Sequence, residues 1–123
     1  MEQPAQIITV ADLKKYYTVG PNIVKALDGV SLDVKSGEFV GIMGRSGSGK
    51  STLLNMLAGL ESPTDGFLEI DGAPVGILSE RERIRYRRNS IGFVFQSYNL
   101  MPQYTTLENV ALPLAIRGVS KRV

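Results

Sequence analysis

Residues 41–54 of the chain read GIMGRSGSGKSTLL. Polar residues separate Gly44, Gly47 and Gly49, and a single lysine, Lys50, follows them. A backbone without side chains that can adopt positive φ is able to turn its N–H groups inward around an anion. A helix that begins near Lys50 adds the positive end of its dipole at the same place. The stretch therefore predicts a loop that wraps phosphate groups.

Residues 44–51 fit the pattern G-x-x-x-x-G-K-[ST], which is the P-loop or Walker A motif. We expect Lys50 to place its charge on the β- and γ-phosphates of a nucleotide and the Ser51 hydroxyl to coordinate Mg²⁺. A glycine-rich turn that matches by chance is the alternative. The predicted nucleotide-binding residues of the loop are Gly44, Arg45, Ser46, Gly47, Ser48, Gly49, Lys50, Ser51 and Thr52.

The flanking sequence supplies the context that a P-loop requires. FVGIM (39–43) is apolar on both faces, as a strand buried within a sheet is. After the loop, one helical face is apolar, and Gly59 follows the expected helix. That face consists of Leu53, Met56, Leu57 and Leu60. A buried strand before the loop and an amphipathic helix after it favour the P-loop over the chance match.

Further strands and helices are predicted on both sides of this unit. IITVADLKKYY (7–17) and VKALDGVSLDV (24–34) have strand composition, and Asp28-Gly29 is a strong hairpin signal inside the second stretch. FLEI (67–70) and SIGFVF (90–95) are also predicted as strands. The capping boxes Ser79–Glu82 and Thr105–Glu108 each predict the start of a helix, and Pro113 is expected to kink the second one.

Composition restricts the class of protein. The 123 residues are 43% hydrophobic, which indicates one globular domain at most. The net charge of +2 indicates an ordinary surface and no nucleic-acid partner. Five arginines between positions 81 and 88 fit either a solvated helix face or an anion or partner contact. There is no cysteine and no histidine, so disulfides, thiolate metal sites and imidazole bases are excluded.

The sequence also predicts an intracellular chain. The first residues, MEQPAQ, are polar and do not form a signal peptide. No apolar run approaches the roughly 20 residues that a membrane helix needs.

The long stretch VKALDGVSLDVKSGEFVGIMGRSGSGKSTLLNMLAGLESPTDG closely resembles the nucleotide-binding subunits of ABC transporters. IGFVFQSYNLMP is similar to the Q-loop region of that family. LSERERIRYRRNSIGFVFQ and ENVALPLAIRGVSKR resemble the subfamily of lipoprotein-releasing, macrolide-exporting and cell-division ATPases. The resemblance covers about residues 7–122. Arg45 departs from it, because proline is common there in the family.

The resemblance implies roles for residues outside the loop. Tyr17 matches the aromatic residue that stacks on adenine, with Tyr16 as the alternative. Gln96 matches the Q-loop glutamine, which reaches Mg²⁺ or the attacking water. The implied catalytic residues are therefore Gln96 and Lys50, and the implied metal ligands are Ser51 and Gln96. The implied cofactors are ATP and Mg²⁺.

The resemblance also implies a fold and an assembly. The fold is α/β, of the P-loop NTPase type. It would consist of an N-terminal antiparallel β subdomain, the P-loop strand and helix, and the start of a helical subdomain. The implied partners are a membrane-spanning transporter subunit or domain and a second nucleotide-binding subunit. The implied location is cytoplasmic and peripheral, at the inner face of the cell membrane.

Three family motifs have no counterpart in residues 1–123: the LSGGQ-type signature, the Walker B strand that ends in Asp-Glu, and the switch histidine. We therefore expect one partial nucleotide-binding domain that binds ATP without turnover. Three alternatives remain. A small kinase would need a lid with arginines and an acceptor pocket, and no stretch of the sequence has that form. A GTPase would need the base-reading motif N-K-x-D, which is absent from the sequence. A non-catalytic nucleotide-binding or interaction protein is the third.

Overall fold

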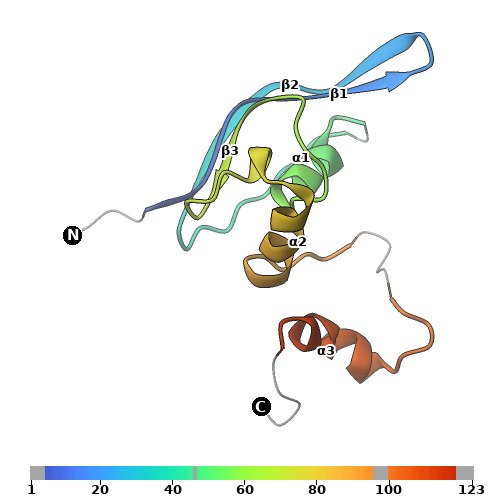
Figure 1. Ribbon diagram of the computed structural model, residues 1–123. Helices are drawn as coiled ribbons and strands as arrows, with labels where there is room; N and C mark the ends of the chain where they lie inside the picture. Colours follow the sequence, from blue (N-terminus) through green and yellow to red (C-terminus); the bar gives the residue numbers. More distant parts are fainter. Residues whose placement is uncertain (1–4, 46, 96–99, 119–123) are drawn as a thin grey trace.

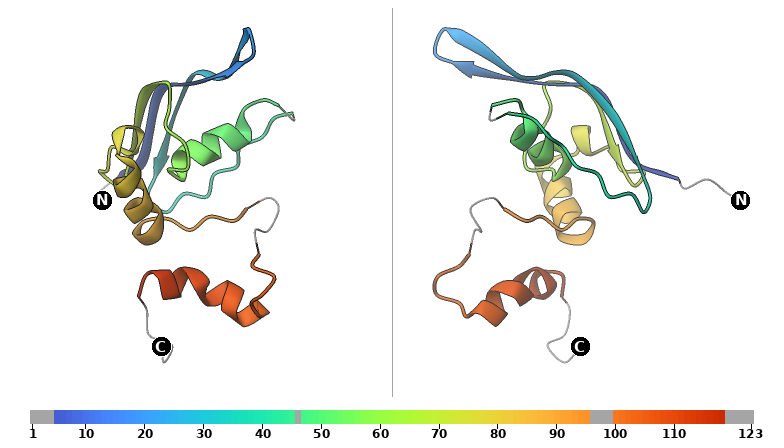
Figure 2. Two further views of the ribbon diagram at one scale, coloured as in Figure 1. Left: turned by 45° about the vertical axis from the view of Figure 1, so that its right-hand side comes forward. Right: turned by 180° about the vertical axis from the view of Figure 1, so that it is seen from behind.

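The computed structural model describes residues 5–45, 47–95 and 100–118 (Figure 1). Its elements are β1 (Gln6–Val19), β2 (Asn22–Lys35), α1 (Lys50–Leu57), β3 (Asp65–Ile70), the short 3₁₀ helix η1 (Val75–Ile77), α2 (Glu80–Asn89) and α3 (Thr106–Ile116). An antiparallel sheet in the order β2-β1-β3 lies above α1, and α2 lies beside β3. In both further views α3 lies apart from the sheet (Figure 2).

The long β1–β2 hairpin corrects the predicted turn at Asp28-Gly29. The turn is at residues 20–21, because Val19 pairs with Asn22 and the two 14-residue strands pair along their lengths. Asp28 instead lies inside the ladder, opposite Lys14, where the register shifts. Gly29 adopts φ 92° there, and a Cβ on it would lie 2.8 Å from Asp12 Oδ1. The Asp-Gly pair thus forms an irregularity within β2 and not a turn. The positive φ of glycine serves in such an irregularity as it would in a hairpin turn.

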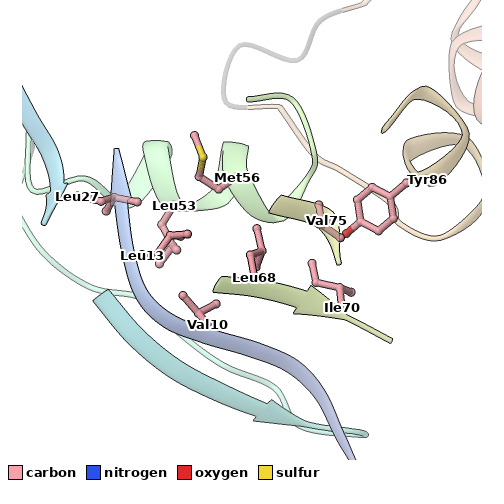
Figure 3. Packing of buried hydrophobic residues seen from close by; sticks show 9 residues of the cluster. All are labelled: Val10, Leu13, Leu27, Leu53, Met56, Leu68, Ile70, Val75 and Tyr86. Carbon is pink, nitrogen blue, oxygen red and sulfur yellow. The ribbon is translucent and has the colours of Figure 1, made fainter. Parts of the chain in front are cut away.

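The core lies between the sheet and the helices α1, η1 and α2 (Figure 3). Its buried side chains are Val10 and Leu13 of β1, Leu27 of β2, Leu53 and Met56 of α1, Leu68 and Ile70 of β3, Val75 of η1 and Tyr86 of α2. Tyr86 carries a polar group into this cluster, and its hydroxyl donates to the carbonyl of Leu57 at 2.7 Å. Burial raises the pKa of Tyr86 to about 12. The core thereby fixes the position of α1, which carries the P-loop at its N-terminus.

The helix after the loop begins at Lys50, as predicted. Leu53 and Met56 are buried and Leu57 packs against the core, so three of the four predicted face residues are confirmed. The prediction that Leu60 belongs to this helix face is wrong. α1 ends at Leu57, and the Leu60 side chain lies beyond it and is 38% exposed. The chain leaves the helix at Gly59, which has φ 72°.

Two predicted strands, at residues 39–43 and 90–95, are wrong. Residues 39–43 are irregular, and Phe39 and Met43 are at least 95% exposed. Residues 91–95 are also irregular, and Ser90 is the C-cap of α2, which ends at Asn89. A strand that is apolar on both faces needs strands beside it to satisfy its backbone. Within the described part of the chain, the sheet contains only β1, β2 and β3. The prediction at residues 67–70 is confirmed by β3.

Local capping fixes the starts of α2 and α3. Ser79 Oγ accepts a hydrogen bond from the Glu82 N–H, which is one half of the predicted box. At Thr105 both halves form, with Glu108 and Thr105 exchanging bonds of 3.1 Å. None of the helices in residues 5–45, 47–95 and 100–118 combines the length and the apolar character needed to cross a membrane.

The arginines of α2 divide between structure and solvent. Arg87 Nη1 donates to the carbonyl of Gly59 at 2.7 Å, next to the end of α1. Arg81, Arg85 and Arg88 are exposed. This arrangement favours the solvated helix face over an anion contact.

Candidate functional site

The P-loop turns directly into the N-terminus of α1. Gly47 and Gly49 adopt φ 82° and 95°, in the left-handed region that glycine favours. Gly49 is the N-cap, and no side chain caps the helix. The first turn of α1 also contains no acidic residue. The positive end of the helix dipole and its N–H donors are therefore not neutralised by α1 itself, which suits an anion.

The loop glycines are required for different physical reasons. A Cβ on Gly49 would lie 2.5 Å from the carbonyl oxygen of Ala26 in β2, so backbone approaches backbone there. A Cβ on Gly44 would lie 2.6 Å from Ser48 Oγ, across the loop. At Gly47 there is open space, and only the positive φ favours glycine. Through these contacts the two ends of the loop, at Gly44 and Ser48, lie close together, and β2 lies against the loop at Gly49.

Lys50 and its neighbours supply the side chains of the loop. Lys50 Nζ donates to the carbonyl oxygen of Gly44, so its ammonium group lies over the loop. Ser51 is exposed in the first turn of α1, and Thr52 is half-buried beside it. An ammonium group and a hydroxyl at the mouth of a loop of N–H donors are groups that bind phosphate and a hard cation.

A cavity of about 570 Å³ joins this loop to the hairpin. Its lining residues are Tyr17 of β1, Val24, Lys25 and Ala26 of β2, and Gly47, Gly49, Lys50, Ser51 and Thr52 of the loop and α1. Two of the lining residues are lysines and none is acidic. Tyr17, whose role the family resemblance implied, thus lies in the same cavity as residues of the loop. The described lining is positively charged and fits a polyphosphate.

The two candidate tyrosines lie in different surroundings. Tyr17 lines the cavity, and its hydroxyl donates to the Glu61 carboxylate. The Tyr16 hydroxyl instead donates to the carboxylate of Asp28, and that bond raises the Tyr16 pKa. Tyr16 is not among the residues that line the cavity. The geometry therefore favours Tyr17 as the residue that meets a ligand.

Several predicted site residues are not brought into the cavity. Gly44, Arg45 and Ser48 belong to the loop but do not line it. Ser46 and Gln96 lie outside the described residues. The metal-ligand prediction can therefore be located in the structure only at Ser51.

The sequence analysis missed the β2 side of the cavity. Val24 lies opposite Tyr17 in the ladder, and Lys25 lies opposite Tyr16. The hairpin turn at residues 20–21 brings these residues to the loop, and the predicted turn at Asp28-Gly29 concealed that pairing. A Gly-Pro pair between two strand-like runs was the signal that could have found it.

A second hollow, of about 560 Å³, lies between α2 and α3. Its lining is largely apolar and includes Ile84, Ile91, Leu112 and Ile116. None of the predicted site residues lies in it. The hollow is thus separate from the candidate site.

Comparison with known proteins gives a consistent result. The family model described as "ABC transporter" matches residues 27–123. The lipoprotein-releasing system ATP-binding protein LolD of Alcanivorax borkumensis is 46% identical over 96% of this chain. The macrolide export ATP-binding/permease protein MacB of Brucella abortus is 47% identical over 93% of it. The chain spans 52% of that LolD and 18% of that MacB.

Solved structures agree with the sequence matches. The dimeric structure of MJ0796, a bacterial ABC transporter cassette, superposes with a TM-score of 0.87 and 48% identity. A second structure of that cassette, a post-hydrolysis state bound to ADP and Pi, gives the same TM-score at 47% identity. Each match covers 90% of this chain and 48% of the other. The curated MJ0796 protein comes from Methanocaldococcus jannaschii, and this chain spans 47% of it.

The fold expected from the sequence is therefore confirmed at the level of the cassette, over about half of its length. The match of the family model over residues 27–123 shows that the chain belongs to the ABC transporter family.

Proposed function

We propose that this chain is the ATP-binding part of an ABC transporter ATPase subunit and that its cavity binds Mg-ATP. One observation carries the proposal: Tyr17 and the P-loop, 30 or so residues apart in sequence, line one cavity with a positively charged wall. The names of the relatives support it, since LolD and MacB are both described as ATP-binding proteins.

Different residues of the cavity would bind the phosphates, the Mg²⁺ ion and the base of the nucleotide. We assign the phosphate oxygens to the backbone N–H groups of Gly47 and Gly49 and of the N-terminus of α1, which would donate hydrogen bonds to them. The Lys50 ammonium group would exchange the neutral Gly44 carbonyl for a charged phosphate oxygen, which gives a stronger bond because both partners are then ionised. Ser51 offers an oxygen to Mg²⁺, which neutralises phosphate charge when bound. The Tyr17 ring offers a face on which adenine can stack.

We further propose that the whole protein couples Mg-ATP binding and hydrolysis to transport. Its partners would be a membrane-spanning subunit or domain and a second nucleotide-binding subunit, at the cytoplasmic face of the membrane. The MacB relative, named both ATP-binding and permease, and the dimeric MJ0796 cassette support these partners. Residues 1–123 would be one partial nucleotide-binding domain, since they span about half of the MJ0796 and LolD proteins.

Gln96 has a proposed role in the longer protein only. Its family counterpart acts on metal, water and the membrane partner, and not on adenine. Gln96→Ala in that protein should therefore leave ATP affinity nearly unchanged and reduce transport-coupled hydrolysis. A variant with the wild-type rates of both hydrolysis and transport would contradict this role.

Isothermal titration of the chain with Mg-ATP tests the proposed function. Lys50→Ala removes one charge-assisted phosphate contact, worth about 1.5–3 kcal/mol, so affinity should fall roughly 10- to 150-fold. Lys35→Ala is the matched control, because Lys35 is an exposed lysine at the far end of β2. Circular dichroism should show both variants folded. Equal affinity in wild type and Lys50→Ala would refute the assignment of the loop.

A further inference from the structure

Residues 61–64, with sequence ESPT, are hydrogen-bonded to residues 14–16 of β1. The Thr64 N–H donates to the Lys14 carbonyl at 2.8 Å. The Tyr16 N–H donates to Thr64 Oγ1 at 2.9 Å. Lys15 Nζ donates to the Ser62 carbonyl at 2.7 Å. These three bonds hold the segment against the strand that carries Tyr17.

Glu61 begins this segment and points its carboxylate at the Tyr17 hydroxyl. The hydroxyl oxygen lies 2.8 Å from one Glu61 oxygen and 2.9 Å from the other. Asn55 of α1 also donates to Glu61, at 3.5 Å. Glu61 is half-buried, so the bond to its carboxylate is shielded in part from water. It thus connects the hairpin to the helix that bears the P-loop.

The Tyr17 ring is restrained from a second direction. Lys15 Nζ lies 5.3 Å from the centroid of the ring, within the range of a cation–π contact. Burial and the hydrogen bond to Glu61 raise the pKa of Tyr17. A tyrosine hydroxyl is protonated at neutral pH in any case, and it donates to Glu61 here. A tyrosine has two side-chain torsions, and a fixed hydroxyl position together with the fixed backbone leaves the ring little freedom.

We propose that Glu61 is a positioning residue for base recognition: it holds the Tyr17 ring at the cavity, ready to stack on the nucleotide base. The inference rests on the proposed function, because it assigns a partner to the residue that meets adenine there. Without Glu61 the Tyr17 hydroxyl would keep only its side-chain hydrogen bond with Thr52, near the end of a hairpin whose residues 18–25 are exposed. The ring would then be held less firmly. Binding would then have to order the ring, which weakens affinity.

The test compares two ligands, Mg-ATP and magnesium tripolyphosphate. Both contain three linked phosphates, and only ATP carries a nucleoside with its base. Both reach the P-loop, and only ATP reaches Tyr17. Glu61→Ala should weaken ATP binding about 2- to 10-fold, the effect of freeing one side chain, and leave tripolyphosphate affinity unchanged. Glu61→Gln, which keeps an acceptor, should restore most of the ATP affinity. Glu80→Ala, an exposed glutamate on α2, is the matched control.

Tyr17→Phe provides a second route to the same answer if Glu61→Ala does not fold. It keeps the ring and removes the hydroxyl, so it should reproduce the selective loss of ATP affinity. Adding Glu61→Ala to Tyr17→Phe should then cause no further loss of ATP affinity, since the Tyr17–Glu61 bond is already absent from Tyr17→Phe. Unchanged ATP affinity in Tyr17→Phe, or an equal loss of ATP and tripolyphosphate affinity in Glu61→Ala, would overturn the inference. Wild-type protein that binds neither ligand would instead refute the proposed function.

Discussion

Gly49 lies so close to the carbonyl oxygen of Ala26 that a Cβ on the glycine would be 2.5 Å from it. Ala26 belongs to β2, and Gly49 is the N-cap of α1. The same Cβ would meet Leu27, a buried core residue, at 3.0 Å. The N-terminus of α1 thereby lies directly against β2, and glycine is the residue that permits the approach.

Gly49→Ala should therefore destabilise the chain as well as distort the loop. The left-handed backbone costs an alanine about 1–2 kcal/mol, and contact with a backbone oxygen adds to this because backbone cannot move aside. We expect the free energy of unfolding in urea to fall by more than about 2 kcal/mol. Gly41→Ala is the control, since it meets open space without a positive φ. Equal stability of the two variants would contradict the close approach.

Tyr17 and Tyr16 should differ sharply in their effect on nucleotide binding. An aromatic ring stacks on any base, with each stack worth roughly 1–3 kcal/mol. Tyr17→Ala should therefore weaken ATP and GTP binding alike, by about 5- to 150-fold. Tyr16→Ala should leave both affinities close to wild type, because Tyr16 bonds Asp28 outside the cavity lining. Calorimetric titration of both variants with both nucleotides measures this.

Two results would count against this assignment. Loss of ATP binding with GTP spared in Tyr17→Ala would mean that hydrogen bonds read the base. A loss confined to Tyr16→Ala would mean that the neighbouring tyrosine is the stacking residue.

Tyr86 should make stability depend on pH above 10. Burial raises its pKa to about 12, against about 10 in an unfolded chain. The neutral phenol is thus favoured in the folded state. Its stabilising contribution is fully present below pH 10 and is lost as pH rises through 12. Below pH 10, Tyr86→Phe should cost about 1 kcal/mol by removing the bond to the Leu57 carbonyl.

The measurement is the difference in unfolding free energy between wild type and Tyr86→Phe from pH 9 to 12. Wild type should lose stability relative to Tyr86→Phe steadily above pH 10, because phenylalanine does not titrate. Tyr104→Phe serves as the control at an exposed tyrosine. A difference that stayed constant up to pH 12 would contradict a buried, neutral phenol.

The exposed apolar segments at residues 39–43 and 91–95 should make the 123-residue chain self-associate. Phe39, Met43 and Val94 are each at least 95% exposed. Large exposed apolar patches and unpaired strand-forming segments both promote association. Light scattering should show a mass above that of one chain, and the double variant Phe39→Glu/Val94→Glu should reduce it. The same sample should release phosphate from ATP no faster than background.

A monomer at all concentrations that hydrolyses ATP would contradict both parts of that prediction. In that case an acidic residue of this chain would have to act as the base. Glu69 and Asp71, in and after β3, are the first candidates for substitution.

The sequence by itself determined the features that depend on a few neighbouring residues. The start of α1 at Lys50 and the capping box at Thr105 are confirmed in this way. Each depends on backbone φ or on a hydrogen bond within three residues, so local chemistry is sufficient. The family resemblance is also confirmed, by the match of the family model over residues 27–123. A family is recognised from the order of residues along the chain, so the sequence is sufficient for it.

Only the tertiary structure decided what depends on register and on distant contacts. The turn at residues 20–21, and not Asp28-Gly29, sets the pairing that brings Val24 beside Tyr17. The tertiary structure also puts Tyr17, and not Tyr16, in the cavity lining. The bond from Tyr17 to Glu61 spans 44 positions in sequence. Apolar runs at 39–43 and 90–95 satisfied the pattern of strands without the neighbours that strands need. Periodicity reports which side chains avoid water, whereas a sheet forms only where a second backbone lies alongside to pair.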